Sequence, residues 1–246
     1  MKNVYSNYKK CIFTVITGGY DELLEPAIRS RDWDYICFTD TPNIKSKNWK
    51  IRPIHEKDLQ IACPKRRANA VVMKYYEYLS DEYDICLYID GNIKIKKKLD
   101  DFLQQFKYDP TKHDLMIPDH PDRICIYKEA DAIIRLNKDN QDKVKKHIDI
   151  IRNNKYPIDR GLYETCIMVI TRKSEMTKKL YDKWFDVYMS MPSKRDQLSL
   201  SYATWLLNDE PQILSYPPPT GSVGKERRPF IKYFETARQH KKVAPQ

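Results

Sequence analysis

Short apolar runs alternate with amphipathic stretches along most of this chain. The runs are bounded by charged residues, Gly or Pro, and they lie at residues 11–17, 34–40, 85–89, 114–118 and 165–171, with a shorter one at 49–54. Runs of this length are typical of strands buried on both faces in a mostly parallel sheet. The stretches between them carry apolar residues three or four positions apart, which predicts helices packed against that sheet. The pattern therefore predicts one α/β domain with a mostly parallel central sheet flanked by helices.

One predicted helix carries cations beside its apolar stripe. Pro64 favours a helix start, and the pattern predicts that this helix continues to about Leu79. Arg67 and Lys74 lie on the side next to the buried stripe, where they could reach a diphosphate or simply cover the edge of the core. The pattern predicts further helices at 99–106, 124–136, 141–151, 174–189 and 193–206, with the one at 141–151 basic and solvated.

The central stretch 85–96 places an acid where two patterns meet. An unbroken apolar run ends at Asp90, and residues 93–96 then alternate apolar and basic, as in a strand with one wet face. Gly91 and Asn92 between them favour a plain hairpin turn. Asp90 also lies at the carboxyl end of a core strand, where α/β sheets bind ligands, and Asp90 with Asn92 offers oxygen ligands for a hard divalent cation. The two interpretations are compatible.

Other polar residues follow predicted strands in the same way. Thr17 and Gly18 follow the first strand, without the glycine spacing of a dinucleotide fingerprint or a P-loop. Asp40 follows the second strand, where a ribose contact and a turn opener are equally good explanations. Two polar loops come later, at 119–123 and 156–164. In the first, Pro121 predicts a helix start, and a helix cap explains Asp122.

The acid near the last helix has a structural explanation. Asp196 follows Ser193 at the expected start of that helix, where a capping-box acid is favoured by the helix dipole. From residue 217 onward the chain gains Pro, Gly and charge, which predicts a division into a domain at 1–216 and a tail or lid with little core content at 217–246.

The composition favours some classes of binding partner but does not select one of them. The formal charge of +10 favours anionic partners, such as nucleotides, nucleic acid or an acidic membrane surface. The six cysteines are widely spaced and mostly lie in apolar runs, which predicts buried reduced thiols and no zinc site. No apolar run is long enough to span a bilayer, and the polar start argues against a signal peptide, so we expect a cytoplasmic protein. The basic tail could touch an anionic membrane.

Eight ordered segments resemble a known family. They are ITGGYD (16–21), YICFTD (35–40), WKIRP (49–53), IDGNI (89–93), HPDR (120–123), CIYKEA (125–130), GLYE (161–164) and RDQLS (195–199). Together they resemble the glycosyltransferase-like domain of plant mucilage-related and alkaline-ceramidase-named proteins and of bacterial polysaccharide-locus relatives. That family is similar to GT-A glycosyltransferases. The resemblance implies a single domain with a GT-A-like, Rossmann-type sheet. It also implies a nucleotide-diphosphate sugar as donor, Mn²⁺ or Mg²⁺, and a glycan or glycolipid acceptor.

The resemblance also implies roles for individual residues. Asp90 and Asn92 stand where the family metal motif has two acids, so Asn92 departs from it. In the implied site, Asp196 is the first candidate for the base, Glu164 the second, and Gln197 lines the reacting face if the sugar configuration is retained. The implied donor contacts are Thr17, Gly18, Asp40, Arg67, Lys74 and Asp90, and the implied substrate contacts are His120, Arg123 and Tyr163.

Two other functions fit parts of the sequence. A non-catalytic module that binds polyanions or nucleic acid would use the positive charge and the 18 Tyr residues. Against it, basic and aromatic residues do not gather on one element, so we expect no nucleic-acid partner. A sugar nucleotidyltransferase would also use a metal ion, but its usual Gly-rich, Arg-containing entry loop is missing.

Overall fold

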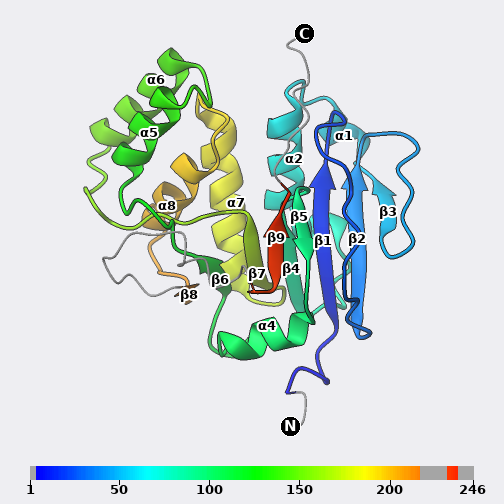
Figure 1. Ribbon diagram of the computed structural model, residues 1–246. Helices are drawn as coiled ribbons and strands as arrows, with labels where there is room; N and C mark the ends of the chain where they lie inside the picture. The colour runs from blue at the N-terminus through cyan, green and yellow to red at the C-terminus, as the bar shows by residue number, and fades with distance from the viewer. Residues whose placement is uncertain (1–3, 217–231, 238–246) are drawn as a thin grey trace.

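A central seven-stranded sheet organises the molecule (Figure 1). The computed structural model describes residues 4–216 and 232–237. The strand order is β3-β2-β1-β4-β7-β6-β8, and among these strands β7 alone runs against the others. The strands are β1 (Lys10–Ile16), β2 (Trp33–Thr39), β3 (Lys50–Pro53), β4 (Ile85–Ile89), β6 (Leu115–Pro118), β7 (Ile167–Thr171) and β8 (Ile213–Tyr216). The predicted mostly parallel sheet is confirmed.

Different elements cover the two faces of this sheet. Alternate strand residues point to opposite faces, so Phe13 and Tyr88 enter one core cluster while Ile12 and Leu87 enter the other. The first face packs against α2 (Pro64–Met73), α3 (Tyr75–Tyr78), α5 (Ile126–Arg135), α6 (Gln141–Asn153), α7 (Glu175–Ser190) and α8 (Gln197–Trp205). The second face packs against α4 (Leu99–Gln105) and the short strands β5 (Ile93–Ile95) and β9 (Phe234–Thr236). A further short helix, α1 (Glu56–Leu59), precedes α2.

The expected hairpin at the centre of the chain is wrong. Strand β4 lies between β1 and β7, whereas β5 leaves the central sheet and pairs antiparallel with β9 in a separate two-stranded sheet. The alternation in β5 was read correctly, because Ile93 and Ile95 are buried and Lys94 is exposed. A turn signal in the sequence cannot tell whether the next strand folds back on the previous one or leaves the sheet.

Several helices begin or end elsewhere than expected. The helix expected to continue to Leu79 is interrupted at Lys74, where α2 gives way to α3. The interruption accompanies the burial of Tyr75, whose ring packs against Phe13 and Tyr181. Helix α5 begins at Ile126, so neither a start at Pro121 nor a cap at Asp122 is correct.

One further expectation is only partly right, and two others agree with the structure. Helix α6 exposes basic residues, but it also buries Val144, Ile148 and Ile151, so it is not a wholly solvated helix. Ser174 caps α7 as predicted, by accepting a hydrogen bond from the Thr177 amide. All six cysteines are free thiols, as expected.

The C-terminal region contributes to the core where it is described. Phe234 is only 2% exposed and packs edge to face with Phe102, with ring centroids 5.0 Å apart. Residues 232–237 thus contribute Tyr233 and Phe234 to the core, but the expectation of little core content at 217–246 stays a prediction, because most of that segment lies outside the described residues. The division of the chain at residue 216 stays a prediction. Within the described part, no helix is both long and apolar enough to cross a membrane.

Candidate active site

Asp90 is fixed at the carboxyl edge of the sheet by three hydrogen bonds. The hydroxyl of Tyr88 donates to Oδ1 of Asp90 at 2.7 Å. The Asp90 amide donates to the Cys166 carbonyl at 2.9 Å, and the Asp90 carbonyl accepts from the Ile93 amide at 3.0 Å. The side chain therefore has a defined position on the face that carries α2, α7 and α8, as the strand alternation from Tyr88 requires.

Negative charge gathers around Asp90. Burial raises the pKa of this carboxyl group, Lys65 and the Tyr88 hydrogen bond lower it, Asp196 and Asp21 raise it, and the net pKa lies above its ordinary value. Asp21 is close because Gly91 has no side chain, and a Cβ atom at Gly91 would lie 3.0 Å from Oδ2 of Asp21. The sequence analysis missed Asp21, although its position after the Gly turn of the adjacent parallel strand was a usable signal.

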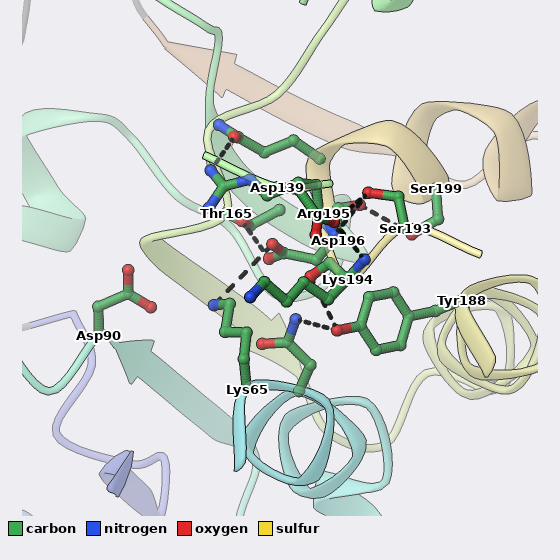
Figure 2. A network of polar contacts seen from close by, with 12 residues as sticks. Lys65, Asp90, Asp139, Thr165, Tyr188, Ser193, Lys194, Arg195, Asp196 and Ser199 are labelled. Carbon is green, nitrogen blue, oxygen red and sulfur yellow. Dashed lines mark hydrogen bonds and ion pairs between the residues drawn. The ribbon is translucent and has the colours of Figure 1, made fainter. Parts of the chain in front are cut away.

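Asp196 lies across from Asp90 in a different environment (Figure 2). It is 8% exposed, Thr165 donates to its Oδ2 at 2.7 Å, and Nζ of Lys65 is 4.0 Å from its Oδ1. Burial raises the pKa of Asp196, but Lys65, Arg195 and the Thr165 hydrogen bond outweigh burial and hold the pKa below its ordinary value. Asp196 is the N-cap residue of α8 but makes no side-chain cap hydrogen bond, so the capping explanation of its side chain is wrong.

A buried polar network holds the turn before Asp196. Oδ2 of Asp139 accepts hydrogen bonds from the Ser193 hydroxyl and the Lys194 amide, both at 2.8 Å. Tyr188 donates to the Lys194 carbonyl at 3.0 Å and accepts from Asn69 of α2 at 2.9 Å, as Figure 2 shows. The network joins α2, α7 and the loop before α6, so the position of Asp196 is set by three separate parts of the chain.

Lys65 lies between the two acids, and the sequence analysis missed it. It is in the first turn of α2, and its positive charge lowers the pKa of both Asp90 and Asp196. Thr17 fixes this helix start by donating to the Pro64 carbonyl at 2.8 Å. Gly18, at φ +62°, packs so closely that a Cβ atom there would lie 3.0 Å from the Pro64 ring. Thr17 and Gly18 therefore position Lys65.

A cavity of about 470 Å³ opens beside this helix start. It is lined by Gly18, Gly19, Asp40, Thr41, Pro42, Leu59 and Arg67. Oδ1 of Asp40 accepts from the Gly18 amide at 2.8 Å, and Oδ2 of Asp40 pairs with Arg67. Asp40 and Arg67 are thus brought together as predicted, but each already has a partner. Asp40 shapes the glycine turn and holds Arg67 at the cavity wall.

Lys74 is not brought to this cavity. It lies at the other end of α2, roughly 14 Å along the helix axis from Lys65 by the ordinary helical rise. Its Nζ is 3.6 Å from Oδ1 of Asp58 and 4.1 Å from the centre of the Phe185 ring. Lys74 therefore neutralises Asp58, and the snorkelling interpretation fits its position better than the diphosphate interpretation.

The loop after β6 forms a compact charged cluster. Arg123 forms an ion pair with the buried Glu129, and Nη2 of Arg123 lies 2.9 Å from Nε2 of His120. Nδ1 of His120 accepts from the amides of Asp122 and Arg123, both at 3.2 Å. His120 and Arg123 are thus committed mainly to their own loop.

Tyr163, Glu164 and Gln197 lie nearer to Asp196 in the fold. The Glu164 amide donates to the Pro118 carbonyl at 2.8 Å, and Asp119 bridges to Tyr163. Tyr163 and Glu164 are the two residues before Thr165, whose hydroxyl group donates to Asp196. Gln197 follows Asp196 and accepts from Arg195 at 3.2 Å.

The residues around Asp90 fit a divalent cation. Asp90, Asp21 and Asn92 offer oxygen ligands, and burial together with the nearby acids Asp196 and Asp21 raises the pKa of Asp90, an effect that a bound cation would oppose. Among the described residues, the group of three His, Cys, Asp or Glu ligand atoms within 4.8 Å of one another is instead His55, Asp58 and Glu77. Lys74 and Lys57 already pair with these acids, so this second group is neutralised by the protein itself.

Sequence comparison identifies the family. Residues 39–216 match the family described as "TOD1/MUCI70, glycosyltransferase-like domain". The chain belongs to this family. The match covers the strands from the end of β2 to β8 and includes Lys65, Asp90 and Asp196. None of the curated proteins matches this TOD1/MUCI70 domain.

Solved structures show the fold. The bifunctional glycosyltransferase WbbM superposes with a TM-score of 0.51 at 9% identity, over 86% of this chain and 39% of WbbM. The chain thus spans about two fifths of the length of WbbM. The glycosyltransferase GlyE of Streptococcus pneumoniae matches at 12% identity over 86% of this chain and 46% of its own, with a TM-score of 0.47. Mouse xyloside xylosyltransferase 1 matches at 9% identity over 78% of this chain and 80% of its own, with a TM-score of 0.45. The fold is GT-A-like, as the resemblance implied.

Proposed function

We propose that this TOD1/MUCI70 domain transfers a sugar from a nucleotide-diphosphate sugar to a hydroxyl group of a glycan or glycolipid. The observation that supports the proposal most directly is the set of acids around Lys65. Asp90, Asp21 and Asp196 meet at the carboxyl edge of a GT-A sheet, beside the cavity that Asp40 and Arg67 line. Ligands bind at this edge in open α/β sheets.

Asp90, Asn92 and Asp21 would hold Mn²⁺ or Mg²⁺ in this proposal. A divalent ion bound there would neutralise part of the charge of a departing diphosphate. The fit rests on the charge around Asp90, because a carboxylate that burial and two neighbouring acids destabilise gains most from a bound cation.

The protein supplies further positive charge from two directions. Lys65 lies at the N-terminus of α2, where the helix dipole also favours an anion, and it faces Asp90 and Asp196. Arg67 lines the neighbouring cavity, where its planar guanidinium group suits phosphate oxygens. We therefore assign the nucleotide to this cavity, with Asp40 holding Arg67 in place and reaching a ribose only if that ion pair opens.

Asp196 remains ionised at neutral pH in this arrangement. Its lowered pKa makes it a weak base but a stable negative charge. Glycosyl transfer develops positive charge on the sugar ring, and a fixed carboxylate nearby stabilises that charge. We propose this electrostatic role for Asp196, with Gln197 beside it.

A donor screen tests the proposed function. UDP-sugars and GDP-sugars are incubated with the protein, Mn²⁺ and a panel of neutral and acidic aryl glycosides, and free nucleoside diphosphate and glycan products are measured. The proposal expects one donor class to release nucleoside diphosphate faster than buffer and to extend an acceptor. Salt-sensitive binding to polyanions, with neither hydrolysis nor transfer from any donor, would instead support the non-catalytic binding module.

A further inference from the structure

We propose that Asp119 and Tyr163 form the acceptor subsite, in which the Asp119 carboxylate binds a hydroxyl group of the acceptor sugar. This inference rests on the proposed glycosyltransferase function and adds where the acceptor lies. Asp119 has no assigned role in the sequence motifs or in the family match, although it begins the charged loop 119–123.

The sheet register places Asp119 level with Asp90. Leu87 of β4 and Met116 of β6 both pair with Val169 of β7, one on each side of it. Asp90 comes three residues after Leu87, and Asp119 comes three residues after Met116. Because β4 and β6 run in the same direction, both acids lie at the same carboxyl edge, about 10 Å apart at two strand spacings.

Strand alternation also places the two acids on the same face. Leu87 and Met116 belong to the core cluster on the α4 face, so residues an odd number of positions further along point to the opposite face. Tyr88 and Ile117, in the cluster with α2, α7 and α8, confirm this alternation. Asp119 therefore shares its face with Asp90 and with Asp196 at the start of α8.

The backbone connects Asp119 to the reacting region. Asp119 forms an antiparallel bridge with Tyr163, the His120 amide donates to the Leu162 carbonyl at 2.8 Å, and the Glu164 amide donates to the Pro118 carbonyl at 2.8 Å. The next residue, Thr165, holds Asp196. One short segment thus carries an aromatic ring beside Asp119 and the hydroxyl group that fixes Asp196.

The Asp119 carboxylate is poorly solvated. The residue is partly exposed, yet its Oδ2 is enclosed and has no hydrogen-bond partner among the residues that the structure describes. Burial raises the pKa of Asp119 to about 6, and a hydrogen bond from Ser215 opposes the rise only in part. A hydroxyl group that reaches the exposed part of this carboxylate makes a stronger hydrogen bond than it would with a fully hydrated acid, because a poorly hydrated charge gains more from a donor.

The contrast with Asp196 supports the assignment. Asp196 already has Thr165, Lys65 and Arg195 to stabilise its charge, whereas Asp119 has the Ser215 hydrogen bond and an enclosed oxygen. Two acids in one site whose environments move their pKa values apart serve different tasks. We therefore assign Asp196 to the donor sugar and Asp119 to the acceptor, with Tyr163 as the flat apolar surface beside the sugar.

Steady-state kinetics with the donor and aryl glycoside found in the screen tests the subsite. Asp119→Ala is expected to raise the acceptor KM about ten-fold or more, the usual result of losing a hydrogen bond to a charged group. Donor hydrolysis without acceptor and Mn²⁺-linked UDP or GDP binding should stay within about two-fold. The matched control is Asp122→Ala, which removes an exposed acid from the same loop and should leave all three quantities unchanged.

Other outcomes separate this inference from the proposed function. An unchanged acceptor KM, or a parallel loss of nucleotide binding, would overturn the acceptor assignment alone. Asp119→Asn, which preserves the shape of the side chain, replaces Asp119→Ala if the latter does not fold, and it is expected to raise the KM by a smaller factor. If the unmodified protein transfers and hydrolyses nothing, the proposed function fails. Saturation-transfer NMR with the aryl glycosides then still tests whether Asp119→Ala removes sugar binding.

Discussion

The Asp90 turn and the Asp196 turn face each other across Lys65, but the pKa values of the two carboxyl groups are shifted in opposite directions. Around Asp90, burial and the acids Asp21 and Asp196 raise the pKa. Around Asp196, Lys65, Arg195 and Thr165 overcome burial and lower the pKa. The two carboxylates are close enough to influence each other, so the difference comes from their immediate neighbours.

Under the proposed function, this difference separates an acid that would take a metal cation from an acid whose charge the protein itself balances. At Asp196 the protein itself supplies the hydrogen-bond partner Thr165 and holds the preceding turn through a network that reaches α2, α7 and Asp139. At Asp90 it places a second acid against Gly91 and supplies one tyrosine hydroxyl and a lysine shared with Asp196. A ligand that brings positive charge is therefore expected on the Asp90 side, and mutations on the two sides should have different effects.

Removing Asp90 should have the largest effect. Asp90→Ala is expected to weaken Mn²⁺-linked binding of a nucleoside diphosphate more than about 100-fold, because a ligand carboxylate is lost from the metal site. Isothermal titration with UDP or GDP, with and without Mn²⁺, measures this change. Asp84→Ala is the matched control, since Asp84 lies just before the amino end of the same strand and pairs with Lys173. Equal Mn²⁺ linkage in the Asp90 and Asp84 variants would contradict the metal assignment.

Changing Asp196 should lower turnover without affecting donor binding. Asp196→Asn keeps the shape of the side chain but removes the fixed charge, so we expect kcat to fall about 30-fold while the Kd of the nucleoside diphosphate stays within about two-fold. Comparing kcat with Kd is the measurement. A weakened Kd with an unchanged kcat would show that Asp196 belongs to the donor phosphate site instead.

Acid should destabilise the fold through His147. His147 is fully buried in α6, and burial lowers its pKa from 6.5 to about 4, with nearby Arg66 acting in the same direction and Asp139 opposing. The folded pKa is below the unfolded one, so the unfolded chain takes up the proton first. Stability is therefore present above pH 6.5 and is lost as pH falls from 6.5 toward 4, by about 2 kcal/mol at pH 5.

Denaturant unfolding at pH 7.5 and pH 5 measures this loss. In His147→Leu the part of the acid sensitivity that comes from this histidine should disappear, because the variant has no group to protonate. His113→Leu serves as the comparison, since His113 lies in a partly exposed turn after α4. If His147→Leu loses as much stability between the two pH values as the unmodified protein, another group titrates in this window.

Removing the lysine between the two turns should have a smaller effect. Lys65→Met keeps the length of the side chain but leaves Asp90 and Asp196 without their shared cation. We expect nucleoside diphosphate binding without metal to weaken about ten-fold, and added Mn²⁺ to recover part of the loss. Lys173→Met, which breaks the ion pair with Asp84 at the other end of β4, is the control and should leave binding unchanged. Equal loss in both lysine variants would mean a general charge effect.

Adding one methyl group should have the smallest effect. Gly91→Ala places a Cβ atom 3.0 Å from Oδ2 of Asp21 and 3.0 Å from Cγ1 of Ile16. We expect about 1 kcal/mol of lost stability and a few-fold weaker Mn²⁺ linkage, because Asp21 must move away from Asp90. Thermal unfolding measures the lost stability, and metal titration measures the weaker Mn²⁺ linkage. Unchanged metal linkage would show that Asp21 does not contribute to the cation site.

The sequence predicted the acids that end strands better than the groups between them. Apolar runs define β1, β2 and β4, and a parallel sheet brings the residues after such strands to one edge, so Asp40 and Asp90 could be placed on that edge in advance. Lys65 could not be assigned in this way, since its role comes from the packing of a helix start against Thr17 and Gly18. Asp21 follows the glycine turn after β1, which was a usable signal, but its closeness to Asp90 depends on the packing of that turn against Gly91. Asp119 could be placed level with Asp90 only from the pairing of β4 and β6 with β7.

The other wrong predictions share a physical cause: each residue contacts a partner that its local sequence does not reveal. Asp196 has the sequence context of a helix cap, but Thr165 and Lys65 compete successfully for its oxygens. The turn after β4 has the composition of a hairpin, but the partner of β5 is β9, far away in the sequence. Lys74 has the right periodicity to join Arg67, yet α2 ends there and Asp58 is nearer. Local propensity cannot report contacts of this kind.

The pairing of β5 with β9 has a consequence for how the molecule is made. All strands of the central sheet precede residue 217, so a growing chain on the ribosome can assemble that sheet before Phe234 is synthesised. The Ala237 amide, which binds the Asn92 carbonyl at 2.8 Å, is added later still. Newly made protein would therefore gain the strand that pairs with β5, and the hydrogen bond to Asn92 next to Asp90, only after the strands of the central sheet have been synthesised.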